Sequence, residues 1–264
     1  MTFPVIHHEV PALLRGLQRA PTAHHAVIGR LLASVLCLAL VAAGVGTVHA
    51  ATALKIVVYG GTGNIGQRIV HEALDRGHKV TVVVRDPSAL AEQSPRLRVF
   101  KGNVLNAAEV ARTISGADVV VSAVSFRGPT ADSGGFSRAA ASLVAALRSF
   151  GSQAPYLIVV GGAGSLEQPP GVHIEIPPAW REEVNGQNNS LAYYRTISNV
   201  RWTYFSPAFM ITPGIRTGQF RLGGDQMIID AKGDSRISME DYAVAVIDEA
   251  EKPAHVRKRF TIGY

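Results

Sequence analysis

The chain has 264 residues, enough for one large or two small domains, and its 47% hydrophobic content suffices for a substantial core. Its net charge of +6 comes from basic residues scattered among acidic ones, without a basic run or an aromatic–basic stripe. This distribution indicates a generally basic surface and argues against nucleic-acid binding. The single cysteine, Cys37, lies near the N-terminus, so the remainder of the sequence offers no thiol for nucleophilic or metal chemistry and no disulfide. The spacing of the other potential ligands also indicates no metal-ligand cluster.

Residues 1–50 have the pattern of a signal peptide or membrane anchor. Residues 31–48 carry no charge and follow three arginines, and Val48-His49-Ala50 has the small-x-small pattern of a signal-peptidase site. Eighteen such residues also just span a bilayer as an uncleaved anchor. The preceding basic residues predict that the following domain lies outside the cytoplasm, with membrane contact only through this segment. If the segment is instead a buried helix or an upstream mis-set start, the domain is cytoplasmic.

The next stretch predicts a strand, a glycine turn and a helix. Ile56–Tyr59 is a short apolar run, the motif Gly60-Gly61-Thr62-Gly63-Asn64-Ile65-Gly66 follows it, and apolar residues then recur at helical spacing. Glycines at this spacing give a tight turn and let the backbone approach phosphates, while the helix start presents free amides and its positive dipole end. The sequence therefore predicts a dinucleotide site, the alternative being a glycine turn that binds no nucleotide.

A second strand, Lys79–Val84, ends at Arg85, which lies 19 residues beyond Gly66. At this place an acidic residue binds the adenosine ribose of NAD, whereas an arginine binds the 2′-phosphate of NADP. A guanidinium suits that phosphate, so NADP(H) is the preferred cofactor. Asp86 keeps NAD(H) as the second choice, and the alternative for Arg85 is a solvated side chain at the end of a strand.

The chain then continues to alternate strands and helices. Further strands are expected over Leu97–Phe100, Ala117–Ser125, Tyr156–Val160, Arg201–Phe205 and Lys258–Ile262, and further helices over Ala107–Ile114, Ser137–Phe150 and from Ser238 through Ala250. This alternation predicts a doubly wound parallel α/β sheet in one domain over residues 54–264. Because ligands bind at the carboxyl ends of parallel strands, residues 122–125 should lie over the cofactor. A hairpin outside the main sheet is expected over residues 218–230.

Residues 165–190 depart from this alternation and are rich in proline, which predicts a loop or lid over the carboxyl edge of the sheet. His173 and Glu175 lie in this loop and are acid/base candidates, although a lone loop histidine is more often merely solvated. Glu182 and Glu183 are interpreted as first-turn partners of a helix dipole rather than as catalysts.

Several of these motifs resemble the atypical short-chain dehydrogenase/reductases, and most closely the group of biliverdin-IXβ reductase and NADH-flavin reductase. The resemblance covers about residues 54–264 and rests on the glycine motif, Val84-Arg85-Asp86, Gly102-Asn103-Val104, residues 160–167, and tail elements such as Ser206-Pro207-Ala208 and Arg236-Ile237-Ser238. It implies a single Rossmann-type domain, behind the N-terminal segment, that binds NAD(P)H and reduces flavins or related conjugated acceptors.

The resemblance also implies which residues hold the cofactor. By position these are Gly60, Thr62, Gly63, Asn64, Ile65 and Gly66 for the pyrophosphate, Arg85 for the 2′-phosphate, Asn103 and Val104 for adenine, and Ala123 and Ser125 for the ribose. Asn103 replaces the aspartate usual in this family, but its amide oxygen can still accept from the adenine amino group. Gly162 and Ala163 stand where biliverdin-type reductases place a serine, so they are assigned to the substrate pocket. The catalytic residues stay unknown, with Ser165 and His173 as candidates only.

The chemistry is limited by a missing pair. Ordinary members of the superfamily transfer a proton through Tyr-x-x-x-Lys, yet no tyrosine here has a lysine four residues later. Hydride transfer to a flavin or quinone remains feasible, because such an acceptor takes its proton from water. Phe209 and Met210 are expected to form an apolar wall for this small-molecule acceptor, or else plain core.

Two other functions stay open at this stage. A redox sensor would bind NAD(P) without turning it over; the missing Tyr-x-x-x-Lys pair favours this sensor, whereas the resemblance of the C-terminal tail favours the reductase. A sugar-nucleotide epimerase would need the same missing pair and a longer C-terminal region. The sequence does not indicate the oligomeric state.

Overall fold

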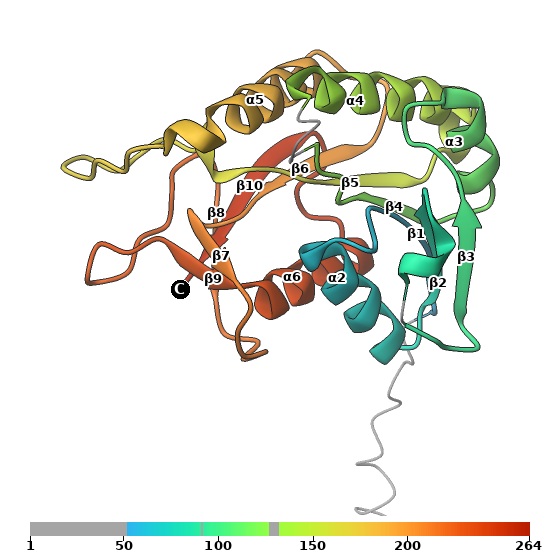
Figure 1. Ribbon diagram of the computed structural model, residues 1–264, viewed down its shortest axis with the longest axis horizontal. Helices are drawn as coiled ribbons and strands as arrows, with labels where there is room; N and C mark the ends of the chain where they lie inside the picture. Colours follow the sequence, from blue (N-terminus) through green and yellow to red (C-terminus); the bar gives the residue numbers. More distant parts are fainter. Residues whose placement is uncertain (1–51, 91, 127–131) are drawn as a thin grey trace, which may run out of the picture. The chain divides into compact units, whose positions relative to one another are not determined.

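The computed structural model describes residues 52–90, 92–126 and 132–264 (Figure 1). The predicted signal peptide or anchor and Cys37 lie outside the described residues. In the described ranges, no helix combines the length and apolar character that crossing a membrane requires.

An eight-stranded sheet organises the described part of the chain. The strand order is β3-β2-β1-β4-β5-β6-β10-β8, and all neighbours are parallel except β10 and β8. The strands are β1 (Lys55–Tyr59), β2 (Lys79–Val84), β3 (Leu97–Lys101), β4 (Val119–Ser122), β5 (Tyr156–Val160), β6 (Trp202–Ser206), β8 (Arg221–Gly223) and β10 (Lys258–Gly263). The strand order reverses between β1 and β4, and doubly wound sheets bind ligands at such a switch point.

Helices cover both faces of this sheet (Figure 1). Helices α2 (Asn64–Asp75) and α6 (Met239–Glu251) lie side by side on one face, and α3 (Ala107–Ile114), α4 (Ser133–Arg148) and α5 (Arg181–Arg195) lie on the other. Strand β1 shows the reason: Ile56 and Val58 enter the core beneath α2 and α6, while Val57 and Tyr59 enter the opposite core. Burial on both faces explains the continuous apolar runs of the strands.

The remaining elements are short. Strands β7 (Met210–Thr212) and β9 (Arg236–Ser238) form a separate parallel pair. Single 3₁₀ turns cover Pro87–Ala89, Gly151–Gln153, Ala163–Ser165 and Pro178–Trp180.

Most predicted elements are confirmed, and β2, β5 and α3 have the predicted bounds. The predicted start of α6 is also confirmed, because the Ser238 side chain accepts from the Asp241 amide at 3.0 Å. Glu182 and Glu183 lie in the first turn of α5, as predicted.

The predicted hairpin over residues 218–230 is wrong. Only β8 is a strand there, and it pairs antiparallel with β10 at the edge of the main sheet, with Leu222 opposite Ile262. The predicted bounds of β4 and α4 also need correction, and α4 begins at Ser133 rather than at Ser137. Strand β4 covers only residues 119–122 of the predicted 117–125, and α4 ends at Arg148 because Gly151, with a φ of +53°, begins a 3₁₀ turn of its own.

Candidate functional site

The turn after β1 is shaped by three glycines. Gly60 has a φ of +78°, and a Cβ atom there would lie 2.3 Å from the carbonyl oxygen of Ala123. A Cβ atom on Gly66 would lie 2.1 Å from the carbonyl oxygen of Gly60. Gly61, which the motif spacing does not mark, would bring a Cβ atom within 2.5 Å of the Val82 side chain. The backbone of this turn therefore lies against β4 and β2 in a way that only glycine permits.

Helix α2 starts directly beyond this turn. Gly63 is extended at the N-cap, where none of the described side chains caps it, and its carbonyl accepts from the Gln67 amide at 2.9 Å. The amides of Asn64, Ile65 and Gly66 precede that first helical bond and so point away from the helix. Together with the helix dipole, these amides fit a dinucleotide pyrophosphate. Thr62 contributes to the turn through its carbonyl, which accepts from the Gln67 side chain at 2.8 Å.

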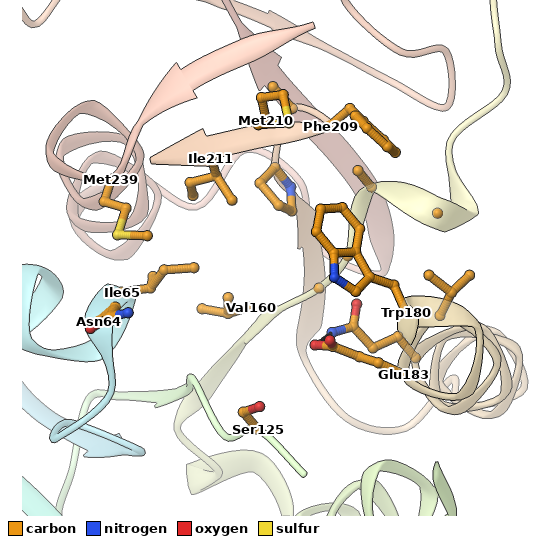
Figure 2. Close-up of a pocket in the computed structure, with 18 of the residues that line it drawn as sticks. Asn64, Ile65, Ser125, Val160, Trp180, Glu183, Phe209, Met210, Ile211 and Met239 are labelled. Atoms are coloured by element: carbon orange, nitrogen blue, oxygen red, sulfur yellow. Dashed lines mark hydrogen bonds between the residues drawn. The ribbon is translucent and has the colours of Figure 1, made fainter. Parts of the chain in front are cut away.

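A cavity of about 550 Å³ opens beside this turn (Figure 2). Its walls come from the start of α2, the segment after β4, the segment after β5, the first turns of α5 and the segment after β6. The predicted site residues that line it are Gly63, Asn64, Ile65, Ala123, Ser125, Gly162, Ala163, Phe209 and Met210. The structure thus brings the predicted ribose, pyrophosphate and acceptor residues to one place.

The floor of this cavity is the glycine-rich segment after β5. Side chains at Gly161, Gly162 and Gly164 would bring a Cβ within 2.1 Å of Tyr204 Cε1, 1.7 Å of Gln187 Oε1 and 2.5 Å of Val184 Cγ1 respectively. The Tyr204 hydroxyl donates to the Gln187 carbonyl oxygen at 3.0 Å. These contacts fix α5 closely over the floor.

The end of the cavity lined by Trp180, Phe209 and Met210, where the sequence predicts the acceptor, is mainly apolar. The rings of Trp180 and Phe209 lie 6.0 Å apart with a tilt of 46°. Met210 is 46% exposed, so it is not plain core, and Met239 and Ile65 face the same space (Figure 2). Flat aromatic and sulfur-containing walls suit a flat conjugated molecule.

Two polar side chains of α5, Glu183 and Gln187, line this apolar cavity. Gln187 Nε2 donates to Glu183 Oε1 at 3.1 Å. Figure 2 shows Glu183 extending from α5 beside Trp180 toward the middle of the cavity. The sequence predicts that Glu183 lies in the first turn of a helix, but it does not predict that Glu183 lines the cavity, because segments distant in the chain form that cavity.

The two catalytic candidates lie away from the cavity lining. Ser165 Oγ donates to the Gly162 carbonyl at 3.2 Å, and both its side chain and its backbone oxygen accept from Arg259. The Arg259 guanidinium also pairs with Asp225, so Arg259 of β10 links the segments that contain Ser165 and Asp225, and the role of Ser165 in these contacts is structural. His173 is exposed in the loop after β5. The geometry supports a catalytic role for neither residue.

The buried tyrosines near α5 are also unsuited to proton transfer. Burial raises the pKa of Tyr194 and of Tyr204 above the ordinary value of a phenol. A phenol is useful as a general acid or base when its pKa is lowered toward the working pH. This agrees with the missing Tyr-x-x-x-Lys pair.

A second cavity of about 400 Å³ lies beyond the carboxyl ends of β2 and β3. Arg85, Lys101 and Arg112 line it together with Glu109, Asn103, Gly102 and the half-exposed ring of Phe100. Three cations and an aromatic face fit a phosphate and an adenine ring. The Asn103 side-chain oxygen accepts from the Leu105 amide at 3.0 Å, which leaves one of its two lone pairs. Val104, in contrast, packs into the core.

The fold and this site define a Rossmann-type dinucleotide-binding protein. The profile of the family described as NAD(P)H-binding matches residues 60–253, and the chain belongs to this family.

Three solved structures show how far the likeness extends. A Bacteroides thetaiotaomicron protein provisionally assigned as an epimerase is 36% identical, with a TM-score of 0.72 over 81% of this chain and 98% of its own. A Burkholderia pseudomallei protein provisionally described as exported is 35% identical, with a TM-score of 0.69 over 80% of this chain and 100% of its own. A Streptococcus pneumoniae protein provisionally assigned as an NADH-flavin reductase is 29% identical, with a TM-score of 0.68 over 80% and 99%. The resemblance to the NADH-flavin reductase group of atypical short-chain dehydrogenase/reductases is thereby confirmed.

Proposed function

We propose that this chain is an NADPH-preferring reductase that transfers a hydride to a flavin, a quinone or a similar flat conjugated acceptor. The observation that carries the proposal is the continuity of the large cavity, which runs from the start of α2 to the walls formed by Trp180, Phe209 and Met210. When bound, the reduced nicotinamide supplies the hydride. The provisional assignment of the Streptococcus pneumoniae neighbour supports the same reaction class.

The residues of the chain act mainly by binding and orientation. The amides at the start of α2 hold the pyrophosphate, and the segment 123–125 orients the ribose on the nicotinamide side. The apolar walls place the acceptor ring and exclude water from it. No protein acid is required, because a flavin or quinone takes its proton from water.

The NADPH preference rests on the second cavity. Arg85 leaves β2 directly into it, and Lys101 and Arg112 add two further positive charges. A 2′-phosphate would form charge-assisted hydrogen bonds there, whereas the ribose hydroxyl of NADH would not.

A fluorescence titration of the purified chain with NADPH and NADH tests the cofactor. Arg85→Ala should weaken NADPH binding about tenfold or more and leave NADH binding nearly unchanged. Arg98→Ala is the matched control, because Arg98 is exposed on the neighbouring strand β3 and does not line the cavity. If neither dinucleotide binds at tens of micromolar, the proposal fails.

A second candidate function is an NAD(P) sensor that binds the cofactor without turnover. The missing Tyr-x-x-x-Lys pair and the raised tyrosine pKa values favour it. Mixing the protein with NADPH and FMN separates the two, because a sensor would bind NADPH but not oxidise it. An epimerase, as the Bacteroides thetaiotaomicron neighbour is provisionally assigned, would need the same missing pair.

We also propose that residues 1–50 carry the domain out of the cytoplasm, either cleaved or as an anchor. The uncharged segment 31–48 supports this, as does the description of the Burkholderia pseudomallei neighbour as exported. Cell fractionation with N-terminal sequencing of the mature protein tests it. Cleavage would give Ala51 as the first residue, retention in the membrane would indicate an anchor, and a soluble cytoplasmic protein would overturn the proposal.

A further inference from the structure

Positively charged side chains gather at the edge of the main sheet where its parallel strands begin, opposite the carboxyl edge that holds both cavities. Six exposed cations lie at the first position of a strand or one residue before it, and we call them the basic row: Lys55, Lys79, Arg96, Arg201, Arg257 and Lys258. None of these six side chains forms an ion pair with another of the described residues.

The strand pairing brings the cations of the basic row close together. Lys55 and Lys79 are register partners on β1 and β2. Arg96 directly precedes β3, the other neighbour of β2, and Arg201 and Lys258 stand at the starts of the neighbouring strands β6 and β10. Neighbouring strands lie about 4.8 Å apart, so the row extends over about 30 Å from β3 to β10. Like charges at such spacing repel each other and lower the stability of the sheet.

The acidic side chains nearby do not neutralise the basic row. Asp118, which precedes β4, accepts from the Lys55 backbone amide at 2.7 Å rather than from a side chain of the row. The acids at the ends of α2 and α6 contact side chains outside the row, with Asp75 on His71 and with Asp248 and Glu251 on Arg76. The repulsion is therefore unrelieved within the described part of the chain, and an anionic partner would relieve it.

The course of the chain points to the nature of this partner. Strand β1 begins at Lys55, in the basic row, so residues 49–54 connect the uncharged segment 31–48 to this edge of the domain. Six residues reach at most about 20 Å. If segment 31–48 enters a bilayer, it holds the basic row near the phospholipid headgroups. Basic residues beside a membrane-inserted segment favour anionic lipids.

We propose that the basic row docks on the anionic headgroups of a phospholipid membrane, so that the cavity at the opposite edge of the sheet faces the aqueous phase. The inference rests on the proposed export of the domain through residues 1–50. A nucleic acid is the competing polyanion, and stacking on aromatic rings is a usual part of single-strand binding. The exposed aromatic side chains of the described residues, Phe100 and Trp180, line the two cavities instead of the row.

Headgroup contact can be measured on the full chain with a single fluorophore. Cys37 is the only cysteine, so Cys37→Ser allows one probe to be attached through Ser198→Cys, exposed before β6, or through His173→Cys, exposed in the loop after β5. Each labelled chain is reconstituted in vesicles of phosphatidylcholine, with or without phosphatidylglycerol, that contain a lipid with a nitroxide quencher on its headgroup. In the anionic vesicles the probe at residue 198 should be quenched severalfold more than in the neutral ones, and more than the probe at residue 173. Added salt should remove the difference, because it screens exposed charges.

Charge reversal in the basic row identifies the cause. Lys79→Glu combined with Lys258→Glu should reduce the quenching at residue 198 in anionic vesicles to the level in neutral ones. The matched control, Arg181→Glu combined with Lys232→Glu, makes the same change in net charge at exposed positions of α5 and of the loop before β9. This control should leave the quenching unchanged. Circular dichroism verifies that both double variants are folded, and the comparisons of lipid and salt do not depend on them.

The outcomes separate this inference from the proposed export. Equal quenching at residue 198 in both kinds of vesicle, stronger quenching at residue 173, or quenching that persists after charge reversal would overturn the inference, while retention of the chain in the vesicles would still uphold membrane insertion. A chain that associates with neither kind of vesicle would overturn both proposals. Tighter binding of a short DNA duplex than of anionic vesicles at the same salt concentration would make the row a nucleic-acid surface and overturn the lipid assignment.

Discussion

Gly66 and Gly60 lie so close that a Cβ atom on Gly66 would be 2.1 Å from the Gly60 carbonyl oxygen. That oxygen also accepts from the Gly63 amide at 3.0 Å, so it cannot simply move away. The end of β1 and the start of α2 are therefore held at a distance that permits no side chain between them. The geometry of the proposed pyrophosphate site depends on this contact.

The first prediction concerns this contact. Gly66→Ala should destabilise the protein by about 1–3 kcal/mol or more, because overpacking a rigid backbone contact forces the turn to shift. Loss of NADPH affinity should accompany it. Urea unfolding and NADPH titration measure the two effects. Gly224→Ala is the control, because nothing lies within 4 Å of a Cβ at that position, and it should behave like the parent.

A second prediction concerns the acceptor wall. Trp180→Ala should raise the KM for a flavin or quinone by about tenfold, since removal of an aromatic wall loses a stacking contact and leaves a gap. The affinity for NADPH should change little, because Trp180 lies on the proposed acceptor side. Leu222→Ala controls for loss of an exposed apolar side chain elsewhere. An equal change in both substrates would contradict this division of the cavity.

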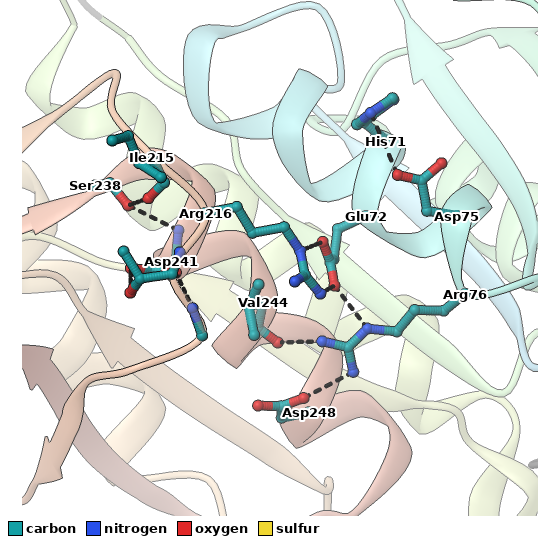
Figure 3. Close-up of polar contacts among 12 residues, drawn as sticks. His71, Glu72, Asp75, Arg76, Ile215, Arg216, Ser238, Asp241, Val244 and Asp248 are labelled. Carbon is teal, nitrogen blue, oxygen red and sulfur yellow. Dashed lines mark hydrogen bonds and ion pairs between the residues drawn. The ribbon is translucent and has the colours of Figure 1, made fainter.

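The third prediction concerns a buried carboxylate on the cofactor helix (Figure 3). Glu72 accepts from Arg76 at 2.7 Å and from Arg216 at 2.7 and 2.8 Å, and Arg76 also donates to Asp248 and to the Val244 carbonyl. Arg76→Ala should cost about 2–3 kcal/mol, and Arg216→Ala, whose side chain is more exposed, about 1 kcal/mol. Denaturant unfolding of both variants measures the two losses of stability, with Arg98→Ala as the control. A larger loss in Arg216→Ala than in Arg76→Ala would contradict this prediction.

The fourth prediction concerns acid stability. Burial alone would raise the pKa of Asp241, but hydrogen bonds from Thr217, Gly218 and Tyr264 hold it below the ordinary value. Since this folded-state pKa is lower than the unfolded one, the stabilisation is complete above about pH 4 and is lost as the pH falls through the folded-state value.

Asp241→Asn should therefore be less stable near neutral pH and lose less stability on acidification. Urea unfolding from pH 7 down to pH 3 shows both effects. Asp234→Asn, at an exposed position in the loop before β9, should keep the acid dependence of the parent. An unchanged acid slope in Asp241→Asn would contradict the assignment.

Much of the fold follows from local patterns. The bounds of β2 can be predicted from its β-branched run, because a strand that is buried on both faces is apolar along its whole length. The start of α6 can be predicted from its capping serine, because the serine binds a helix amide only three residues away. Strand β8 could not be predicted in the same way. It has three residues, and its place in the sheet depends on pairing with β10 rather than on its own pattern.

The site was predictable to a similar degree. The spacing of Gly60, Gly63 and Gly66 indicates the turn, since the requirement is one of backbone conformation. The position of Glu183 in the cavity was not predictable, because it depends on how α5 packs on Gly162 and Gly164. The role of Gly61 was hidden for the same reason: its neighbour, Val82, belongs to another strand.

The close packing of α5 on the glycine floor limits how this protein can change its substrate range. A side chain at Gly161 would meet the ring of Tyr204, and one at Gly164 would meet Val184, so we expect single substitutions at these two positions to be poorly tolerated. At Gly162 a side chain would meet the flexible end of Gln187, which can move aside. Met210 and Trp180, in contrast, are partly exposed and can vary in size one at a time. New acceptors should therefore be acquired through the walls, and a mutant library aimed at altered specificity should diversify these two positions and keep the floor fixed.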